Sequence, residues 1–274
     1  MLRKRIRKIY REFRKRRRTN IYILSFPKCG RTWLRMLLGQ VIQSHFRRTD
    51  QDPTEVYRIT RRIEDMPTVR FTHDDDPQWK RPDEIQRSKR RYRNKKVVLL
   101  VRDPRDAVVS NYFQKRYRDF GNKEAFDGTL SEFVRSEVGG LQSLITFYNV
   151  WAAAKNRPMD FLLMRYEQLH QDTRREVARL LEFVGIEKQD PSLIEEAVEA
   201  SSFRNMREME SSKSLSKNRM RPKDESDPRS YKMRKGKVGG YREQLSEEDV
   251  AYIDQVIRER LDPYYEWYFP ESSG

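Results

Sequence analysis

The chain has 274 residues, with 58 lysines and arginines against 42 aspartates and glutamates, and its formal net charge is +16. No stretch approaches the ~18 consecutive apolar residues of a membrane-spanning helix, and the single cysteine, Cys29, excludes an internal disulfide framework and a cysteine-rich zinc site. This cysteine usage fits a reducing cytoplasm. The length suits one sizeable α/β domain or two small ones.

The positive charge is concentrated in two segments. Residues 1–18 hold eleven lysines and arginines against Glu12, and residues 211–237 hold ten against three acids, so the rest of the chain is nearly neutral. Helical spacing in the first segment places four apolar residues on one face: Leu2, Ile6, Ile9 and Phe13. We predict a basic amphipathic arm over residues 1–18, which either contacts an anionic membrane surface or packs on the body, followed by one domain over residues 19–274.

Strand-like and helix-like patterns alternate along the predicted domain. Apolar runs predict strands at residues 21–26, 69–72, 96–101 and 160–165. Helical patterns begin at residues 31 and 104 and continue at residues 130–138, 141–154, 172–184, 191–200 and 246–260. This order predicts a three-layer α/β fold with a central parallel β-sheet flanked by helices. Residues 211–240 have little apolar periodicity, and we expect them to form a mobile basic loop.

The first predicted strand runs through a short loop, residues 27–30, into the first helix. The first turn of a helix presents unpaired backbone N–H groups, which bind anions. Gly30 allows close backbone approach, Lys28 supplies a positive charge and Thr32 a hydroxyl donor. The lysine precedes the glycine, so this is not the Walker loop of nucleoside triphosphatases. We interpret it as a candidate phosphate site, with an ordinary turn as the alternative.

Two further segments supply candidate anion contacts. Arg102 directly follows the third predicted strand and therefore stands at the carboxyl edge of the sheet, where open α/β sheets bind ligands. Its guanidinium suits a phosphate, with Ser110 on the next helix as a further donor, whereas a structural salt bridge is the alternative. Within residues 211–240, three residues would close over an anion or form a solvated charge run: Arg234, Lys235 and Gly236.

These segments, in this order, resemble the sulfotransferase family, whose members transfer a sulfuryl group from 3′-phosphoadenosine-5′-phosphosulfate (PAPS) to an acceptor hydroxyl or amine. The resemblance covers roughly residues 21–260 and rests on five segments: 26–33, 101–113, 165–167, 201–206 and 234–241. It implies a P-loop-like fold, PAPS as co-substrate, and adenosine 3′,5′-bisphosphate (PAP) as product.

Position by position, the resemblance also implies the roles of individual residues. The 5′-phosphosulfate end and the adenine would be contacted by Lys28, Gly30, Arg31, Thr32 and Trp33. The 3′-phosphate would be held by Arg102, Ser110, Arg234, Lys235 and Gly236. Two more residues would lie near the base: Tyr166 and Ser201.

His73 stands where the cytosolic branch of the family has its catalytic histidine, which makes it the candidate general base. A neutral imidazole, with an ordinary pKa of about 6.5, is suited to accept the proton of an attacking hydroxyl at neutral pH. Lys28 and the amides at the helix start would stabilise the charge on the leaving oxygen. This scheme requires no metal, and no metal-ligand spacing stands out in the sequence.

The sequence departs from the family pattern around both motifs. Cys29 replaces the usual serine, and a thiol among cations would have a lowered pKa; Arg31 replaces threonine. Phe71 stands where cytosolic enzymes often have lysine. Acidic residues, Asp74–Asp76, follow His73, so a carboxylate could share or take the role of base.

Two other functions are alternatives to sulfuryl transfer. One is a non-catalytic basic module that binds anionic membrane or nucleic acid through residues 1–18 and 211–237, but charge alone does not explain the loop motifs. We expect no specific nucleic acid partner, since the arm lacks a stack of aromatics. The other is an ATP-dependent small-molecule kinase, which the missing Walker residues argue against.

The acceptor, whether phenol, alcohol, glycan or lipid, is expected to face residues 47–90 and the loop after Lys115.

Overall fold

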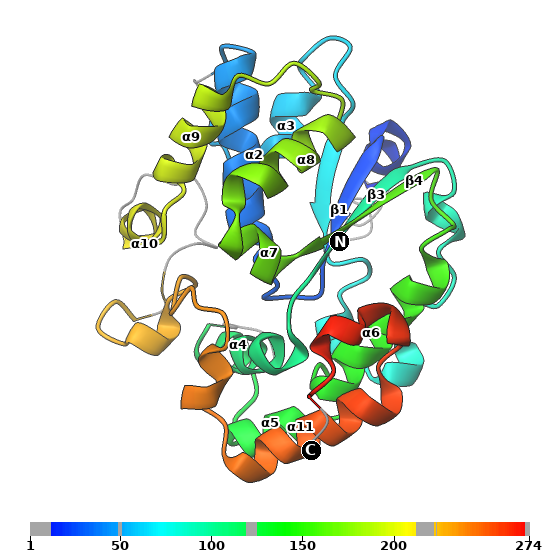
Figure 1. The fold of residues 1–274 in the computed structure, drawn as a ribbon, viewed down its shortest axis with the longest axis vertical. Helices are drawn as coiled ribbons and strands as arrows, with labels where there is room; N and C mark the ends of the chain where they lie inside the picture. Colours follow the sequence, from blue (N-terminus) through cyan, green and yellow to red (C-terminus); the bar gives the residue numbers. More distant parts are fainter. Residues whose placement is uncertain (1–11, 49–50, 119–124, 212–221, 223, 272–274) are drawn as a thin grey trace, which may run out of the picture.

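The computed structural model describes residues 12–48, 51–118, 125–211, 222 and 224–271, and the structural statements below concern these residues (Figure 1). Four strands form one parallel sheet in the order β2-β1-β3-β4. The register places Ile21 opposite Val69 and Lys96, and Lys96 opposite Asp160. The strands are β1 (Ile21–Leu24), β2 (Val69–Thr72), β3 (Lys96–Val101) and β4 (Asp160–Arg165).

The central strands carry the hydrophobic core. All of β1 and residues 97–101 of β3 are buried, because helices cover both faces of these strands. This confirms the predicted three-layer α/β fold with a central parallel sheet. Three strands have the predicted bounds, whereas β1 ends at Leu24, two residues earlier than predicted, where Ser25 and Phe26 leave the sheet.

Two groups of helices flank the sheet, and contacts within each group are extensive (Figure 1). One group comprises α2 (Arg31–His45), α3 (Val56–Thr60), α7 (Tyr166–Gln171), α8 (Thr173–Phe183), α9 (Pro191–Ala200) and α10 (Phe203–Ser211). The other comprises α4 (Pro104–Tyr117), α5 (Leu130–Arg135), α6 (Leu141–Ala154) and α11 (Glu247–Arg260). Short 3₁₀ turns lie at Pro77–Trp79, Pro82–Glu84, Arg90–Tyr92, Pro228–Ser230, Gly240–Glu243 and Pro263–Tyr268.

Most predicted helices occur within one or two residues of their expected bounds. The helix α5 ends at Arg135 instead of residue 138, because Ser136 takes an extended backbone conformation (φ −60°, ψ 135°). The helices α3, α7 and α10 were not predicted. They are short, and α10 buries only Met206 and Glu210, so they contain too few apolar repeats to be recognised in the sequence.

The described part of the N-terminal arm is helical and lies against the body. Residues 12–18 form a helix in which the Glu12 carboxylate lies 2.6 Å from the Arg70 guanidinium on β2. Phe13, which belongs to the predicted apolar stripe, is 56% exposed, and the other stripe residues, Leu2, Ile6 and Ile9, lie outside the described residues. The arm, its membrane contact and the single domain over residues 19–274 stay predictions.

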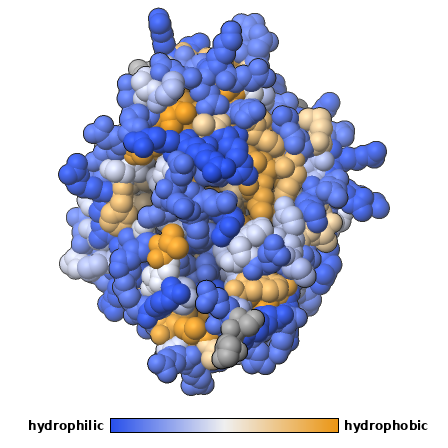
Figure 2. Space-filling model, viewed as in Figure 1, coloured by the Kyte–Doolittle hydropathy of each residue, from blue (hydrophilic) through white to orange (hydrophobic). Residues whose placement is uncertain are grey.

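The surface is dominated by polar side chains. Figure 2 shows that the face viewed in Figure 1 is covered mainly by hydrophilic residues, in keeping with the charge of the chain. Among the helices that the structure describes, none is both long enough and apolar enough to cross a membrane.

Candidate active site

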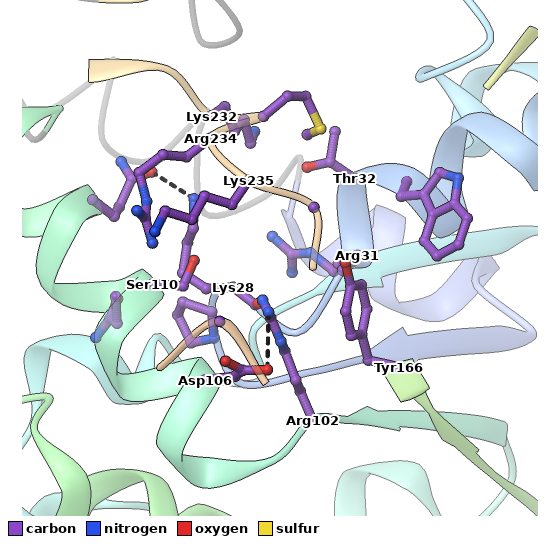
Figure 3. A pocket seen from close by; sticks show the side chains of 18 of the residues that line it. Lys28, Arg31, Thr32, Arg102, Asp106, Ser110, Tyr166, Lys232, Arg234 and Lys235 are labelled. Atoms are coloured by element: carbon purple, nitrogen blue, oxygen red, sulfur yellow. Dashed lines mark hydrogen bonds and ion pairs between the residues drawn. The ribbon is translucent and has the colours of Figure 1, made fainter. Parts of the chain in front are cut away.

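A cavity of about 810 Å³ lies at the carboxyl edge of the sheet (Figure 3). One wall residue follows each strand: Lys28 after β1, His73 after β2, Arg102 after β3 and Tyr166 after β4. All predicted site residues line this one cavity: Lys28, Gly30, Arg31, Thr32, Trp33, His73, Arg102, Ser110, Tyr166, Ser201, Arg234, Lys235 and Gly236. The structure therefore brings together residues that the sequence places in separate segments.

The loop between β1 and α2 is shaped to accept an anion. Gly30 has a left-handed backbone (φ 90°), and a Cβ atom there would lie 2.5 Å from the Tyr166 ring, so only glycine fits. The start of α2 has no side-chain cap and no acidic residue in its first turn. Its N–H groups are therefore available to a ligand.

Lys28 lies beside this helix start, within 3.4 Å of the Gln114 amide oxygen on α4. Burial lowers the pKa of Lys28 to about 7, and the positive charges of Arg118, Arg102 and Arg234 lower it further against the opposing effect of Glu210. Since the neighbouring cations disfavour the protonated amine, an anion in the cavity would raise this pKa again.

The Arg102 guanidinium is held in place by backbone and carboxylate oxygens. It donates to the carbonyl oxygens of Lys28 (3.3 Å) and Lys237 (2.8 Å), and lies 3.4 Å from the Asp106 carboxylate. Its carbon centre stands 4.3 Å from the centroid of the Tyr166 ring, while its buried Nε atom has no hydrogen-bond partner among the residues that the structure describes. Arg102 thus forms a salt bridge with Asp106, which was the alternative to a phosphate contact, and its side chain also lines the cavity.

The predicted basic loop is attached to the cavity wall. The Asp106 carboxylate on α4 accepts hydrogen bonds from the backbone N–H groups of Gly239 (2.8 Å) and Tyr241 (2.9 Å). Arg234 lies 3.9 Å from the centroid of the Phe113 ring. Gly236 has a positive φ of 62°, and a Cβ atom there would approach the Phe203 ring to 2.5 Å. The described part of residues 211–240 is thus more than a solvated charge run.

Aromatic side chains form another part of the wall. The ring centroids of Trp33, Tyr166 and His170 are 6.0 Å apart in each pair, and the His170 Nε2 atom lies 2.9 Å from the Gly236 carbonyl oxygen. The Ser201 hydroxyl is fully buried and has no hydrogen-bond partner in the described part of the chain. Flat rings and an unsatisfied hydroxyl in the same cavity wall suit a heterocyclic base.

His73 is oriented by contacts on both ring nitrogens. Its Nδ1 atom lies 3.0 Å from the Ser25 carbonyl oxygen, and its Nε2 atom is in contact with the Arg31 guanidinium. Burial, and next the charge of Arg31, lower the pKa of His73 well below its ordinary value. The imidazole is therefore neutral at neutral pH, as a general base requires.

The three aspartates after His73 do not line the cavity. Asp74 is buried, and its carboxylate accepts hydrogen bonds from the Tyr92 hydroxyl (2.6 Å) and the Trp151 indole (2.9 Å). It also pairs with Lys89 at 2.7 Å and with Arg91. These contacts give Asp74 a structural role, and the geometry does not favour a carboxylate as the base.

The expectation of a lowered thiol pKa at Cys29 was wrong. The Cys29 side chain is fully buried, it does not line the cavity, and its sulfur lies 3.5 Å from the Tyr148 hydroxyl. Burial raises the pKa of the thiol to about 12. Desolvation outweighs the attraction of the neighbouring cations, so the thiol stays protonated.

Several wall residues were not predicted from the sequence. Asp106 belongs to the same motif as Arg102, and Lys232 lies two residues before Arg234, so proximity to these motifs was the available signal. His170 also lines the cavity, and no motif surrounds it in the sequence. Trp79 and Arg118 belong to the segments expected to face the acceptor, residues 47–90 and the loop after Lys115, and the packing of the turn after β2 and of α4 brings them to the cavity.

The cavity is strongly positive. Figure 3 shows side chains from separate segments reaching into the same space. Among the described residues, Asp106 is the single carboxylate in the wall, against eight cations: Lys28, Arg31, Arg102, Arg118, Lys232, Arg234, Lys235 and Lys237. Within the same described ranges, no three histidine, cysteine, aspartate or glutamate side chains are grouped to hold a metal ion. The fold and this wall define a protein that binds a nucleotide-like polyanion.

Comparison with known proteins identifies the family. The family described as "Sulfotransferase domain" matches residues 18–264, and the chain belongs to this family. It is a PAPS-dependent sulfotransferase, which transfers a sulfuryl group from PAPS to an acceptor. The sulfotransferase prediction is therefore confirmed in preference to a basic binding module or an ATP-dependent kinase.

Relatives of this chain are found among plant and animal sulfotransferases. Cytosolic sulfotransferase 1 of Arabidopsis thaliana is 27% identical, and the alignment covers 89% of this chain and 78% of the relative. Flavonol 3-sulfotransferase of Flaveria bidentis is also 27% identical, with 88% and 81% covered. The crystal structure of mouse sulfotransferase SULT7A1 complexed with PAP shares the fold, with a TM-score of 0.59, 21% identity, and 89% and 84% covered.

Proposed function

We propose that this chain binds PAPS with its 5′-phosphosulfate end on residues 27–33 and its 3′-phosphate between α4 and residues 234–236. The observation that carries the assignment is the meeting of all predicted contact residues around one cavity with eight cations and one carboxylate. PAPS carries about four negative charges at neutral pH, which complements this wall. The adenine would lie beside Trp33, Tyr166 and Ser201.

The unsatisfied groups of the wall support this placement. The buried Nε atom of Arg102 and the buried Ser201 hydroxyl have no partner within the described structure, and buried polar groups normally have one. A Cβ atom at Gly30 or Gly236 would meet the ring of Tyr166 or Phe203, so glycine lets the backbone pack closely on two rings of the cavity wall. These features fit a nucleotide with two anionic ends.

The chemistry assigned to the chain consists of proton transfer and charge stabilisation. PAPS supplies the sulfuryl group and a phosphate leaving group. The Nε2 atom of His73 accepts the proton of the acceptor hydroxyl, while its Nδ1–H bond to Ser25 holds the ring in place. Lys28 and the N–H groups at the start of α2 stabilise negative charge at the 5′ end.

The acceptor is proposed to be a small molecule with a hydroxyl group. Gln78 and Trp79, from the turn after β2, line the cavity, as expected for part of residues 47–90. The Gln78 side-chain oxygen is buried and has no partner within the described ranges, so it offers an acceptor for a second polar group of the substrate. The flavonol specificity named for one relative is consistent with a small acceptor, and relatives named cytosolic support a cytosolic location.

Removing the Arg102 guanidinium is expected to weaken PAP binding by about 10–100-fold, because each hydrogen bond to a charged group contributes about 1.5–3 kcal/mol. Calorimetric titration of wild type and Arg102→Ala with PAP, ADP and ATP measures this. Arg116→Ala is the matched control, since Arg116 also lies on α4 but pairs with Asp127 outside the cavity. Equal affinity in both variants, or a preference for ATP, would contradict the assigned donor site.

PAP binding is expected to take up protons at pH 7–9. The pKa of Lys28 is about 7 in the free enzyme and rises when an anion binds, so the bound state holds more protons and PAP affinity falls as the pH rises. PAP phosphates are already ionised in this range. Calorimetry in buffers of different ionisation enthalpy counts the protons. Lys28→Met should reduce the proton uptake. Lys80→Met, a lysine outside the cavity, should preserve it. An unchanged proton uptake in Lys28→Met would contradict the assignment of Lys28 as the group that is protonated.

A further inference from the structure

The contacts of His73 determine which ring nitrogen carries the proton. The Ser25 carbonyl oxygen can only accept a hydrogen bond, so Nδ1, 3.0 Å away, is the protonated nitrogen. A guanidinium can only donate, so the Arg31 Nη2 group donates to Nε2. The one lone pair with which the neutral imidazole could accept a proton is therefore already engaged by Arg31.

Arg31 is placed where it can serve two partners. It is the first residue of α2, at the anion-accepting helix start, and it lines the cavity. Its second terminal nitrogen, Nη1, is buried and has no hydrogen-bond partner within the described structure. One end of the guanidinium thus holds His73, and the other is unsatisfied in a cavity built for an anion.

An anion would compete with His73 for this guanidinium. Paired with a phosphate or sulfate oxygen, a guanidinium forms hydrogen bonds in which both groups are charged, often two in parallel. The hydrogen bond from Arg31 to the neutral imidazole of His73 has a charge on the donor only, and it is a single bond where a phosphate or sulfate would accept two. The anionic end of the donor nucleotide is therefore the stronger partner, and the long side chain of Arg31 lets it turn from one to the other.

We propose that Arg31 is a positioning residue that engages the Nε2 atom of His73 in the donor-free enzyme and releases it when the 5′-phosphate end of the donor enters. His73 then becomes able to accept a proton only after the donor is in place. The inference rests on the proposed role of His73 and of residues 27–33, and it assigns a function to an arginine that stands where the resembling motif has threonine.

The proposal is tested by the ¹⁵N signals of the histidine side chains in the full chain, titrated with PAP, which has the 5′-phosphate but cannot react. The chain has three histidines, so single His→Gln variants assign them. We expect the Nε2 signal of His73 to move on PAP addition from the position of a hydrogen-bonded lone pair to that of a free one. In Arg31→Gln, the signal should already lie at the free position and should not respond to PAP.

Arg35→Gln is the matched control. Arg35 is also on α2, and its guanidinium lies 4.8 Å from the Phe71 ring, so this variant removes a nearby charge without removing the donor to Nε2. It should behave as wild type. If the His73 signal is the same in wild type and Arg31→Gln, or if PAP leaves the wild-type signal unchanged, the proposal is overturned.

A second measurement uses the reactivity of the lone pair. Diethyl pyrocarbonate modifies unprotonated imidazole, so peptide mass spectrometry of the donor-free protein should show His73 modified at least about tenfold faster in Arg31→Gln than in wild type. His45, which is exposed, is the internal reference. Equal rates at His73 would overturn the proposal. By contrast, full turnover of His73→Ala would overturn the base assignment alone, because the Arg31 contact is measured independently of turnover.

Discussion

Replacing His73 by alanine is expected to lower the rate of PAP formation from PAPS by about 10²–10⁴-fold, the usual contribution of a general base. The imidazole stands at the carboxyl edge of β2, with its orientation set by Ser25, and no aspartate of the following turn lines the cavity. The rate is measured with the acceptor that the wild-type enzyme sulfates fastest in a panel of phenols, alcohols and flavonols.

The affinity for PAP distinguishes loss of the base from damage to the site. His73 is assigned no contact with the nucleotide, and its loss frees Arg31 for the anion, so His73→Ala and the more conservative His73→Gln should bind PAP at least as tightly as wild type. His45→Ala is the control, because His45 is exposed and outside the cavity. Full turnover of both His73 variants would remove this residue from the mechanism.

Removing the charge of Asp74 is expected to destabilise the fold by about 3–5 kcal/mol, the range measured when one partner of a buried ion pair is lost. The side chains of Asp74 and Lys89 are both fully buried and 2.7 Å apart, so Asp74→Asn leaves a buried ammonium without its carboxylate. Asparagine also tolerates the left-handed backbone of this position (φ 51°), which restricts the change to charge and hydrogen bonding.

Urea unfolding of four proteins checks this prediction: wild type, Asp74→Asn, Lys89→Met and the double variant. The double variant should recover part of the loss, because neither charge is then buried alone. Asp75→Asn is the matched control, since Asp75 is also in a left-handed conformation but its side chain is 40% exposed. Its salt bridge with Lys80 should contribute less than about 1 kcal/mol. A loss in Asp74→Asn no larger than in this control would show that the buried pair does not stabilise the turn beside His73.

Strand positions and the order of the binding segments were readable from the sequence because they are local properties. A largely apolar run of four to six residues predicts a strand by itself, and three of the four strands have the predicted bounds. A residue that directly follows a parallel strand lies at the carboxyl edge of the sheet. The positions of Arg102 and Tyr166 in the cavity wall therefore follow from the strands that precede them, and Lys28 lies in the loop between β1 and α2.

The tertiary structure decided what each polar side chain meets. Arg31 and His73 are 42 residues apart, and Asp74 and Trp151 are 77 apart, so no local pattern predicts that they touch. Cys29 shows that local sequence also fails to predict the pKa of a side chain. Its neighbours in sequence predicted a lowered pKa for the thiol, but full burial raises that pKa to about 12. Burial and pairing depend on which distant segments pack together, and for this protein they determine which of the charged residues meet the ligand and which support the fold.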